Sequence, residues 1–330
     1  MRRSKKGIGM ISCDIILTVY DKMDLTRNCL ESVVRHRRPG DRIIIVDNGS
    51  GEETRDFLRR YASSHPEAAI DIVRLEKNQG YLRAANEGLR RSSRDAVCLL
   101  SNETIVTAGW LERMCGLLEA QPHIGIVNPM STTFGLYPAS GQTPEDVARS
   151  LEQEKGRYTE CAGCVGFCML IKRDVMRAVG VLDEVYADGY FEDTDFCRKA
   201  IAAGFTCALA RDAYVWHAEH ATFGSGEREA LFVKNRRIFE ERWGRPERIM
   251  YVASGKGRDR GRIIDECLRA ARRGNWIWLL VPQDEKELFS SCTVHGNIRL
   301  IGVERFVLWL YPWFLYLRKR KKPIDKVLFR

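Results

Sequence analysis

The chain is 330 residues long, which exceeds the usual single domain and favours one large domain with a smaller addition. Hydrophobic residues make up 45% and charged residues 29% of the sequence, a balance typical of globular proteins that argues against long disordered stretches. The formal net charge of +9 favours an anionic partner, whether nucleic acid, anionic lipid or a phosphorylated substrate.

Positive charge is concentrated toward the two ends of the chain. A basic lead occupies residues 1–10, and an unbroken basic run stands at residues 318–322. The N-terminus carries no apolar stretch of the kind found in signal peptides, so we expect a cytoplasmic protein whose eleven cysteines stay reduced. The apolar segment at residues 306–317 contains Pro312 and is shorter than the roughly 20 residues of a membrane-spanning helix.

The first part of the chain alternates short β-branched runs with segments whose apolar residues recur at helical spacing. Strands are expected at residues 13–19, 42–46, 70–75, 96–100 and 124–127. Helices are expected between them, at residues 25–34, 54–61, 82–91 and 110–120. This alternation predicts βαβ units, and therefore a Rossmann-like, mostly parallel sheet flanked by helices.

Regular structure is interrupted at residues 132–160, which predict a mobile connection that faces the substrate. Beyond it we expect strands at residues 165–171 and 207–210 and a helix at residues 193–203. A new pattern starts at residue 248, with strands expected at residues 249–253, 276–281 and 297–303 and a helix at residues 261–272. The chain is thus predicted to consist of the lead, an α/β domain at 11–246 and a small α/β appendage at 247–330.

Three cysteines stand close together at Cys161, Cys164 and Cys168, a spacing that raises the question of a metal site. A second pair at zinc-ribbon spacing is missing from the sequence, and Cys168 falls inside the apolar run 165–171. We therefore favour a buried strand over a metal centre for these residues.

Polar turns follow two of the expected strands. The second strand ends in DNGS at residues 47–50, and the fourth ends in SNET at residues 101–104. Ligands of parallel α/β sheets bind beyond the carboxyl ends of the strands. These turns therefore predict a platform for a nucleotide and a metal ion.

A set of motifs runs through the chain in a fixed order. They are TVYD at 18–21, VDNGS at 46–50, NQG at 78–80, ANEG at 85–88, SNET at 101–104, GFCMLI at 166–171, FEDTD at 191–195 and VWH at 215–217. Over residues 13–224 the sequence in this way resembles the family 2 glycosyltransferases, and the FED and CMLI blocks resemble the rhamnosyltransferase-like branch. The resemblance implies a GT-A fold and inverting transfer of a sugar from a nucleoside diphosphate.

The resemblance also implies a set of residues that bind the sugar nucleotide. Asp47 is expected to contact the base, usually uracil or thymine, although a turn cap is the alternative for this sequence. Arg83 is placed to neutralise a phosphate, with a solvated helix arginine as the alternative. The remaining candidates are Thr18, Tyr20, Gly80, Asn86 and Asn102.

The metal motif departs from the family pattern. Family members usually carry an Asp-x-Asp pair where this chain has Ser101-Asn102-Glu103, so one carboxylate is lost. We expect Glu103 and His217 to bind Mg²⁺ or Mn²⁺ together with the diphosphate, in a weakened site. His220 is a substitute for His217, and a surface role for Glu103 or a structural role for His217 is the alternative.

Inverting transfer needs a base that removes the proton of the acceptor hydroxyl. By resemblance Asp193 is that base, and Glu192 orients the acceptor or the neighbouring loop. Acidic residues are also favoured at a helix N-terminus by capping and by the helix dipole, so a purely structural role is the alternative. We expect Asp195 to be structural.

The end of the chain combines aromatic and basic residues. Trp309, Tyr311, Trp313 and their apolar neighbours precede the basic run at 318–322. Aromatic side chains favour the bilayer interface, and basic runs are attracted to anionic lipid. We therefore predict peripheral contact with a membrane. A buried helix that packs the appendage onto the large domain is the alternative.

Together these features predict transfer of a hexose or deoxyhexose from a UDP- or dTDP-linked donor. The acceptor would be a glycan or lipid-linked glycan in cell-surface polysaccharide synthesis, at the inner face of the cell membrane. A catalytically impaired subunit that binds sugar nucleotides or glycans is the alternative, because the metal motif is degraded. A nucleotidyltransferase is disfavoured, since no glycine-rich phosphate loop follows the first strand. No nucleic-acid-binding module is recognised, so no nucleic acid partner is expected.

Overall fold

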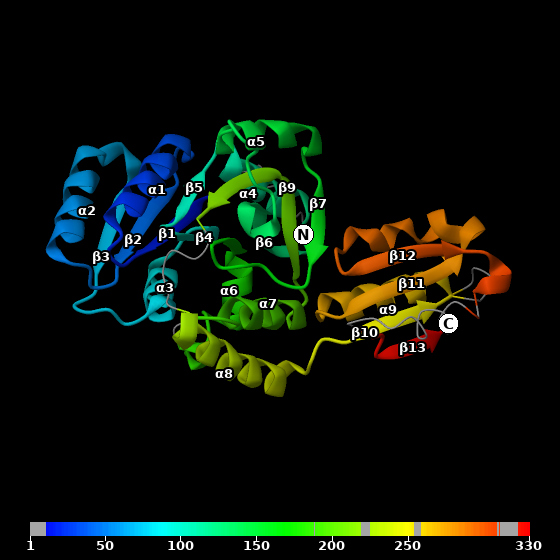
Figure 1. Ribbon diagram of the computed structural model, residues 1–330. Helices are drawn as coiled ribbons and strands as arrows, with labels where there is room; N and C mark the ends of the chain where they lie inside the picture. The colour runs from blue at the N-terminus through cyan, green and yellow to red at the C-terminus, as the bar shows by residue number, and fades with distance from the viewer. Residues whose placement is uncertain (1–10, 188, 219–224, 254–258, 309, 311–322) are drawn as a thin grey trace, which may run out of the picture.

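The computed structural model describes residues 11–187, 189–218, 225–253, 259–308, 310 and 323–330. The basic N-terminal lead, His220 and the aromatic and basic segment at 311–322 lie outside these residues, as does Trp309. The described chain forms two α/β units that lie side by side (Figure 1). None of its helices combines the length and the apolar character needed to cross a bilayer.

The large unit is built on a sheet of nine strands in the order β3-β2-β1-β4-β8-β6-β9-β5, with β7 paired to β9. These strands are β1 (Cys13–Val19), β2 (Arg42–Asp47), β3 (Ile70–Arg74), β4 (Ala96–Ser101), β5 (Thr104–Val106), β6 (Ile124–Met130), β7 (Tyr158–Cys161), β8 (Cys168–Lys172) and β9 (Thr206–His217). Strands β3, β2, β1 and β4 run parallel. The antiparallel strand β8 then joins β4 to β6. The expected α/β fold, with a curled, mostly parallel sheet, is thereby confirmed.

Helices cover both faces of this sheet, because the buried strands present apolar residues in both directions. Cys13, Ile15 and Leu17 of β1 face one core, whereas Ile16 faces the other. The first core is covered by α1 (Met23–His36), α2 (Glu52–Ser64) and α4 (Trp110–Ala120). The second is covered by α3 (Tyr81–Arg91), α6 (Arg173–Val179), α7 (Glu192–Ala202) and part of α8 (Ser225–Trp243).

The connection at residues 132–160 is more regular than its sequence suggests. It contains η2 (Thr132–Phe134), α5 (Pro144–Ser150) and η3 (Leu151–Glu154) before β7. A capping box between Thr143 and Asp146 starts α5, whose Val147 packs against Tyr214 of β9. Residues of this connection do not line the large cavity of the unit, although Thr133 Oγ1 lies 3.0 Å from Nδ1 of His217, which does. That the connection faces the substrate stays a prediction.

The appendage has a parallel sheet of its own in the order β12-β11-β10-β13. Its elements are β10 (Arg248–Val252), α9 (Arg260–Arg272), β11 (Trp276–Pro282), η5 (Gln283–Val294), β12 (Ile298–Val303), η6 (Arg305–Val307) and β13 (Lys326–Phe329). The strand β13 was not expected, and it pairs with β10. We propose a domain boundary between residues 246 and 247, just before β10.

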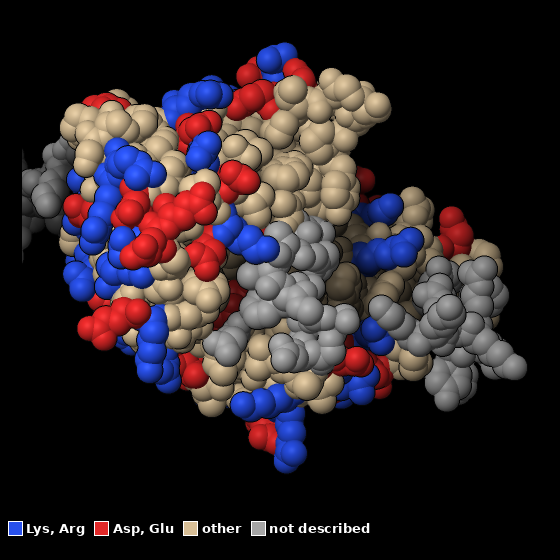
Figure 2. Space-filling model, turned by 60° about the vertical axis from the view of Figure 1, so that its left-hand side comes forward, with Lys and Arg blue, Asp and Glu red and all other residues tan. Residues whose placement is uncertain are grey.

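Charged side chains of both signs are interspersed on the face of the molecule drawn in Figure 2. On that side the net charge of +9 is therefore not gathered into one continuous basic field. Within helices of the described chain, Arg91 pairs with Glu87 and Arg237 with Glu241, each pair one helical turn apart and near the surface. Exposed pairs of this kind contribute little to stability.

Candidate active site

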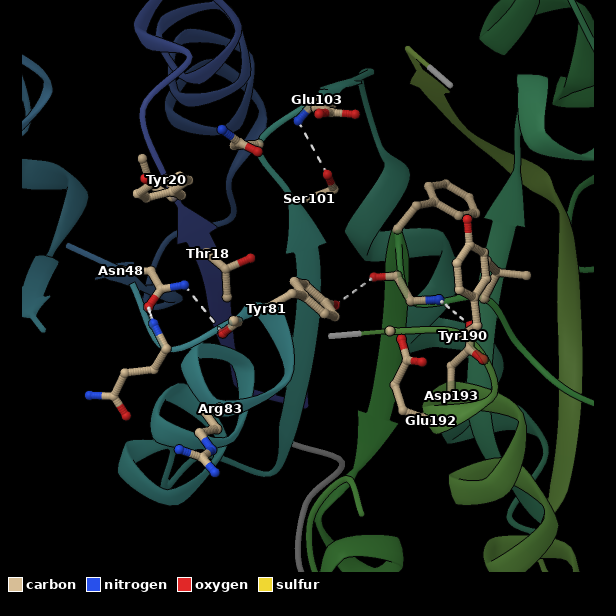
Figure 3. A pocket seen from close by; sticks show the side chains of 18 of the residues that line it. Thr18, Tyr20, Asn48, Tyr81, Arg83, Ser101, Glu103, Tyr190, Glu192 and Asp193 are labelled. Atoms are coloured by element: carbon tan, nitrogen blue, oxygen red, sulfur yellow. Dashed lines mark hydrogen bonds between the residues drawn. The ribbon is translucent and has the colours of Figure 1, made fainter. Parts of the chain in front are cut away.

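A cavity of about 1320 Å³ opens where β1, β2 and β4 end. Its walls come from the turns after these strands, from the start of α3, from the segment before β8 and from the start of α7. Figure 3 shows the two sides of the cavity with Tyr81 between them: Thr18, Asn48 and Ser101 on one side, and Tyr190, Glu192 and Asp193 on the other. Small-ligand pockets usually measure roughly 300–1,000 Å³. This cavity is large enough for two reacting molecules to meet.

One wall of the cavity is a loop that Asn48 holds in place. The Asn48 side chain donates to Asn78 Oδ1 (2.9 Å) and to the Gly80 carbonyl (3.2 Å), and it accepts the Gln79 N–H (2.9 Å). Gly80 has φ of 85° and immediately precedes α3, so it turns the chain in a conformation that suits glycine. Thr18, Tyr20 and Gly80 all line the cavity.

Asp47 does not line the cavity, although its neighbour Asn48 does. The Asp47 side chain is buried, accepts the Ser50 N–H (2.9 Å) and forms a short ion pair with the Arg74 guanidinium. The contacts seen are therefore those of the turn cap given as the alternative. They also place Arg74 beside the turn, where sequence reasoning did not expect it.

Asn86 and Arg83 both lie on α3 but face different surroundings. Asn86 is fully buried, and its amide donates to the Leu182 carbonyl (2.9 Å) and to Glu184 (3.0 Å) and accepts the Leu182 N–H (3.0 Å). It therefore ties α3 to the segment before η4 (Glu184–Tyr186) and does not line the cavity. Arg83 does line it, and its guanidinium lies 3.6 Å from Glu184 and is largely exposed.

The turn after β4 brings Glu103 close to His217. Strand β5 pairs with β9 so that Thr104 lies opposite His217, and the Ala218 N–H donates to the Glu103 carbonyl (3.0 Å). Glu103 and His217 both line the cavity, as does Asn102. The His217 ring stacks on Phe167 at 5.1 Å, and its Nδ1 lies 3.0 Å from Thr133 Oγ1.

These side chains meet the needs of a metal ion only in part. The described residues include no group of three or more His, Cys, Asp and Glu side chains placed to bind one. Glu103 supplies a carboxylate and His217 an imidazole, and both ligand types suit Mn²⁺. Further ligands would have to come from the oxygens of a bound substrate, as expected from the loss of a carboxylate at Ser101.

The opposite wall carries Glu192 and Asp193 in the first turn of α7. Asp193 accepts the Gly166 N–H (3.1 Å), the Thr194 N–H (2.6 Å) and the Thr194 hydroxyl (3.1 Å). Burial raises the pKa of Asp193 to about 6. Burial, together with the adjacent Asp193 charge, raises the pKa of Glu192 to about 8. Near neutral pH the pair therefore holds one proton, which leaves one carboxylate able to accept another.

The backbone just before α7 is strained. Ala187, Tyr190 and Phe191 have φ of 51°, 64° and 74°, and Gly189 has φ of 131°. Non-glycine residues in such conformations each cost on the order of 1–3 kcal/mol, and such strain is found at functional sites. The strained turn ends at Phe191, whose carbonyl accepts the first bond of α7 from Asp195 (2.8 Å).

Asp195 has the structural role expected of it. Its buried carboxylate accepts the Tyr186 hydroxyl (3.1 Å), the Trp243 indole N–H (2.8 Å) and the Arg242 guanidinium (2.8 Å). These contacts attach the C-terminal end of α8 to α7.

The cysteines near this wall are all free thiols. Cys168 lies in β8, buried, with its Sγ 4.0 Å from Cys98 Sγ. Cys161 faces Cys207 across β7 and β9, and the Cys164 N–H donates to Cys197 Sγ (3.2 Å). The strand expected at 165–171 begins only at Cys168, so Val165, Gly166 and Phe167 are left to line the cavity.

Sequence reasoning missed several residues of the walls. Lys22, Lys77, Tyr81, Tyr190 and Phe232 all line the cavity. Lys77 and Tyr81 flank the NQG motif, so the sequence could have indicated that they lie at the site. No such signal marks Phe232 in the sequence, because this residue belongs to α8, a helix with no apolar stripe along one face.

A family model described as "Glycosyl transferase family 2" matches residues 14–180. Glycosyltransferase AglE of Haloferax volcanii is 23% identical over 208 residues, which cover 62% of this chain and 66% of that protein. A poly-beta-1,6-N-acetyl-D-glucosamine synthase of Staphylococcus epidermidis is 29% identical over 198 residues, which cover 59% of this chain and 45% of that protein. The uncharacterized protein y4gI of Sinorhizobium fredii is 26% identical, over 72% of this chain and 28% of its own length. The chain thus matches less than two thirds of each of these relatives.

Solved structures show the same fold. The mannosyltransferase PcManGT of Pyrobaculum calidifontis, in complex with GDP-Man and Mn²⁺, superposes with a TM-score of 0.51 at 18% identity and covers 70% of this chain and 65% of its own. TarS of S. aureus, in complex with UDP-GlcNAc, gives a TM-score of 0.51 at 14% identity, with 71% of this chain and 66% of that one covered. The large unit therefore has the GT-A fold.

Proposed function

The chain belongs to glycosyl transferase family 2, and we propose that it transfers a hexose or deoxyhexose from a UDP- or dTDP-linked donor to a glycan or lipid-linked acceptor, with inversion. The observation that supports this most is the opposition of two chemically different walls across one cavity. One wall carries the Asn48–Gly80 loop with Thr18 and Tyr20, and the other carries the buried carboxyl of Glu192 and the partly buried carboxyl of Asp193.

In the proposed reaction Asp193 is the general base. Its carboxylate accepts the proton of the acceptor hydroxyl while that oxygen attacks the anomeric carbon on the face opposite the diphosphate. The bond between the anomeric carbon and the diphosphate oxygen breaks, the nucleoside diphosphate leaves, and the configuration inverts. Glu192 keeps its proton near neutral pH, because its pKa is raised by burial, and it can donate a hydrogen bond to the acceptor.

The donor would lie along the opposite wall. Thr18, Tyr20 and Gly80 line it, and Asn102 and Arg83 extend it. We propose that Asp47 recognises the base by accepting a base N–H. Because its carboxylate is buried and bonded to Arg74 and the Ser50 N–H here, one of these bonds would be exchanged for the base when the donor binds. Asn86 would act indirectly, by fixing the position of α3.

Glu103 and His217 would hold a divalent metal ion, Mg²⁺ or Mn²⁺, on the same wall. Such an ion would stabilise the negative charge that develops on the leaving diphosphate. In support, PcManGT was solved in complex with both GDP-Man and Mn²⁺. Since Ser101 replaces a carboxylate, we expect weaker metal binding here than in an Asp-x-Asp enzyme.

We further propose that the appendage brings the enzyme to the anionic inner face of the cell membrane, where a lipid-linked acceptor would be found. The basic run at 318–322 supports this, and the exposed side chains of Phe306 and Leu310 border the same part of the chain. Truncation is a poor test, because β13 lies beyond the run and pairs with β10. Replacing the five basic residues with serine should abolish flotation with anionic vesicles, whereas unchanged flotation would contradict membrane binding through this run.

A catalytically impaired binding subunit is the second candidate, favoured by Ser101 at the metal motif. A donor screen separates the two. UDP-, dTDP- and GDP-sugars are incubated with the protein and Mg²⁺, Mn²⁺ or EDTA, and both donor binding and nucleotide release are measured, with Glu103→Ala as the comparison. Metal-dependent release from one donor class, weakened by Glu103→Ala, supports the enzyme. Binding that never leads to release, with any glycan acceptor added, supports the subunit.

A further inference from the structure

Asn235 is a fully buried amide on α8 that does not line the cavity. Its side-chain nitrogen donates to three backbone carbonyls, those of Tyr186 (2.6 Å), Gly189 (2.5 Å) and Tyr190 (3.3 Å). Its Oδ1 has no partner among the described residues. All three bonds converge on one short segment, the turn that precedes α7.

This turn is the strained one. Ala187, Gly189, Tyr190 and Phe191 all have positive φ, so their carbonyls point in directions that an ordinary strand or helix does not use. Asn235 satisfies two of those carbonyls and that of Tyr186 from inside the protein. Without these bonds we expect the non-glycine residues of the turn to relax to negative φ, which is lower in energy for them.

The turn determines where the reacting carboxyls lie. Gly189, Tyr190 and Phe191 line the cavity, and Glu192 and Asp193 follow directly. The helix that carries Asn235 is itself firmly attached at this point. Its Phe239 ring lies 5.2 Å from Phe191, and its Arg242 and Trp243 bind the buried Asp195 of α7.

We propose that Asn235 is a positioning residue that holds Ala187 and the segment Gly189–Phe191 in their strained conformation, so that Glu192 and Asp193 face the acceptor. The proposal rests on the function proposed above, because it assigns Asn235 to the same reaction. Asn235 touches no substrate in this scheme, and it acts only through the three carbonyls that it binds.

The proposal separates the two sides of the cavity. The donor wall is held by Asn48 from β2 and the loop before α3, so its geometry does not depend on α8. Loosening the turn should therefore lower kcat for transfer and leave the KM for the donor nearly unchanged. It should also admit water to the carboxyls. Besides burial, Asp193 raises the pKa of Glu192, and Cys197 of α7 raises the pKa of Asp193. Tyr81 of α3 is a further titratable neighbour, because both carboxyls raise its own pKa. Hydration then moves the acidic limb of the pH–rate profile to lower pH.

The test uses the full chain with two variants at this position. Asn235→Asp keeps the shape and removes the donors, and Asn235→Ser removes most of the reach. Arg237→Ala, on an exposed face of the same helix, is the control. We expect at least a tenfold loss of kcat in both variants, a donor KM within twofold of the unmodified protein, and an acidic limb lowered by half a pH unit or more. Equal losses in kcat and donor affinity, or no loss in kcat, would overturn the proposal.

A second variant tests the strain itself. Ala187 has φ of 51° and ψ of −117°, a conformation that glycine adopts without strain. Ala187→Gly in the Asn235→Ser background should restore at least a third of the lost kcat. A smaller rescue would argue that Asn235 does not act by holding the strained turn in place. If the unmodified protein transfers no sugar, the proposed function fails. Hydrogen exchange at residues 186–195 then tests separately whether Asn235 holds the turn before α7. Faster exchange in Asn235→Ser but not in Arg237→Ala would support this role, and equal exchange in the two variants would refute it.

Discussion

Two neighbouring carboxyls with raised pKa values are the most informative residues of this protein. Glu192 is buried and Asp193 is partly buried next to it, so the pair cannot ionise completely near neutral pH without a high cost. One carboxylate and one carboxylic acid then stand at the same wall. That combination suits a base and a hydrogen-bond donor working together.

The pair predicts a bell-shaped dependence of kcat/KM on pH. Activity should rise as Asp193 ionises, with a midpoint at about 6, and fall as Glu192 loses its proton at about 8. Both midpoints belong to the coupled pair. Glu192→Gln should remove the alkaline limb and leave the acidic midpoint near 6, because Glu192 is already uncharged where Asp193 ionises and burial is the main cause of the raised pKa of Asp193. An alkaline limb that persists in Glu192→Gln would show that another group causes it.

The free energy of unfolding should also depend on pH through Glu192, and it should fall as pH rises. The folded-state pKa of Glu192 is raised above its unfolded value, so the protonated form favours folding and this contribution is lost as pH rises toward about 8. Glu192→Gln should therefore raise the melting temperature more at pH 9 than at pH 6. Thermal unfolding at the two pH values checks this, and an equal change at both would contradict the assignment.

At the scale of elements, the strands were the most predictable part. Residues expected for β1, β2, β3 and β4 agree with the structure to within one residue at each end. The apolar runs of β1, β2 and β4 are buried on both faces, whereas β3 at the sheet edge is only partly buried. The start of β8 was misplaced. Asn128 accepts the Val165 N–H and donates to the carbonyls of Val165 and Cys168, so the chain turns before it can join the ladder. Such a long-range amide contact leaves no local signal in the sequence.

Helix α8 is a second element that the sequence pattern did not predict. Its apolar residues do not gather on one face, so periodicity gives no reason to expect it, yet it contributes Phe232 to the cavity and Asn235 to the turn before α7. Motif resemblance singled out Glu103, Asp193, Thr18, Tyr20 and Gly80, all of which line the cavity. It could not tell that Asp47 and Asn86 contact protein groups instead of the cavity, because burial is a property of the folded chain.

The turn between β2 and α2 offers a test of the donor wall. Gly49 has φ of 80°, and an added Cβ would lie 2.4 Å from the Lys77 carbonyl carbon, a backbone atom that cannot move aside cheaply. Gly49→Ala should lower stability by about 2 kcal/mol and displace the Asn48–Gly80 loop. Donor affinity, measured by calorimetry, should fall about tenfold or more. Gly40→Ala, where φ is also positive but no atom lies within 4 Å, is the matched control.

At the scale of the whole molecule, the two units are joined by a buried ion pair. Glu160 of β7 accepts two bonds from Arg272 of α9, at 2.8 and 2.9 Å, and its carbonyl accepts the Gly296 N–H (2.9 Å). Arg198 of α7 also donates to the Arg272 carbonyl (3.3 Å). The appendage is thus attached to the sheet that carries the active site.

Breaking this pair from one side should be costly. Arg272→Ala leaves the carboxylate of Glu160 buried without its main partner, which should lower the free energy of unfolding by about 3 kcal/mol. The double variant Glu160→Gln with Arg272→Met removes both charges and should lose much less. Urea unfolding of the three proteins checks this, and equal losses in the single and double variants would contradict the ion pair as the main link.

The central claim is that Asp193 removes the acceptor proton during sugar transfer. Its most direct test is the rate of acceptor-dependent transfer, with the donor found in the screen, for the unmodified protein and for Asp193→Asn. The account predicts a fall of about 10²–10⁴-fold in kcat with donor binding retained, since the amide keeps the shape but cannot take a proton. Transfer by Asp193→Asn within about threefold of the unmodified rate would contradict the account.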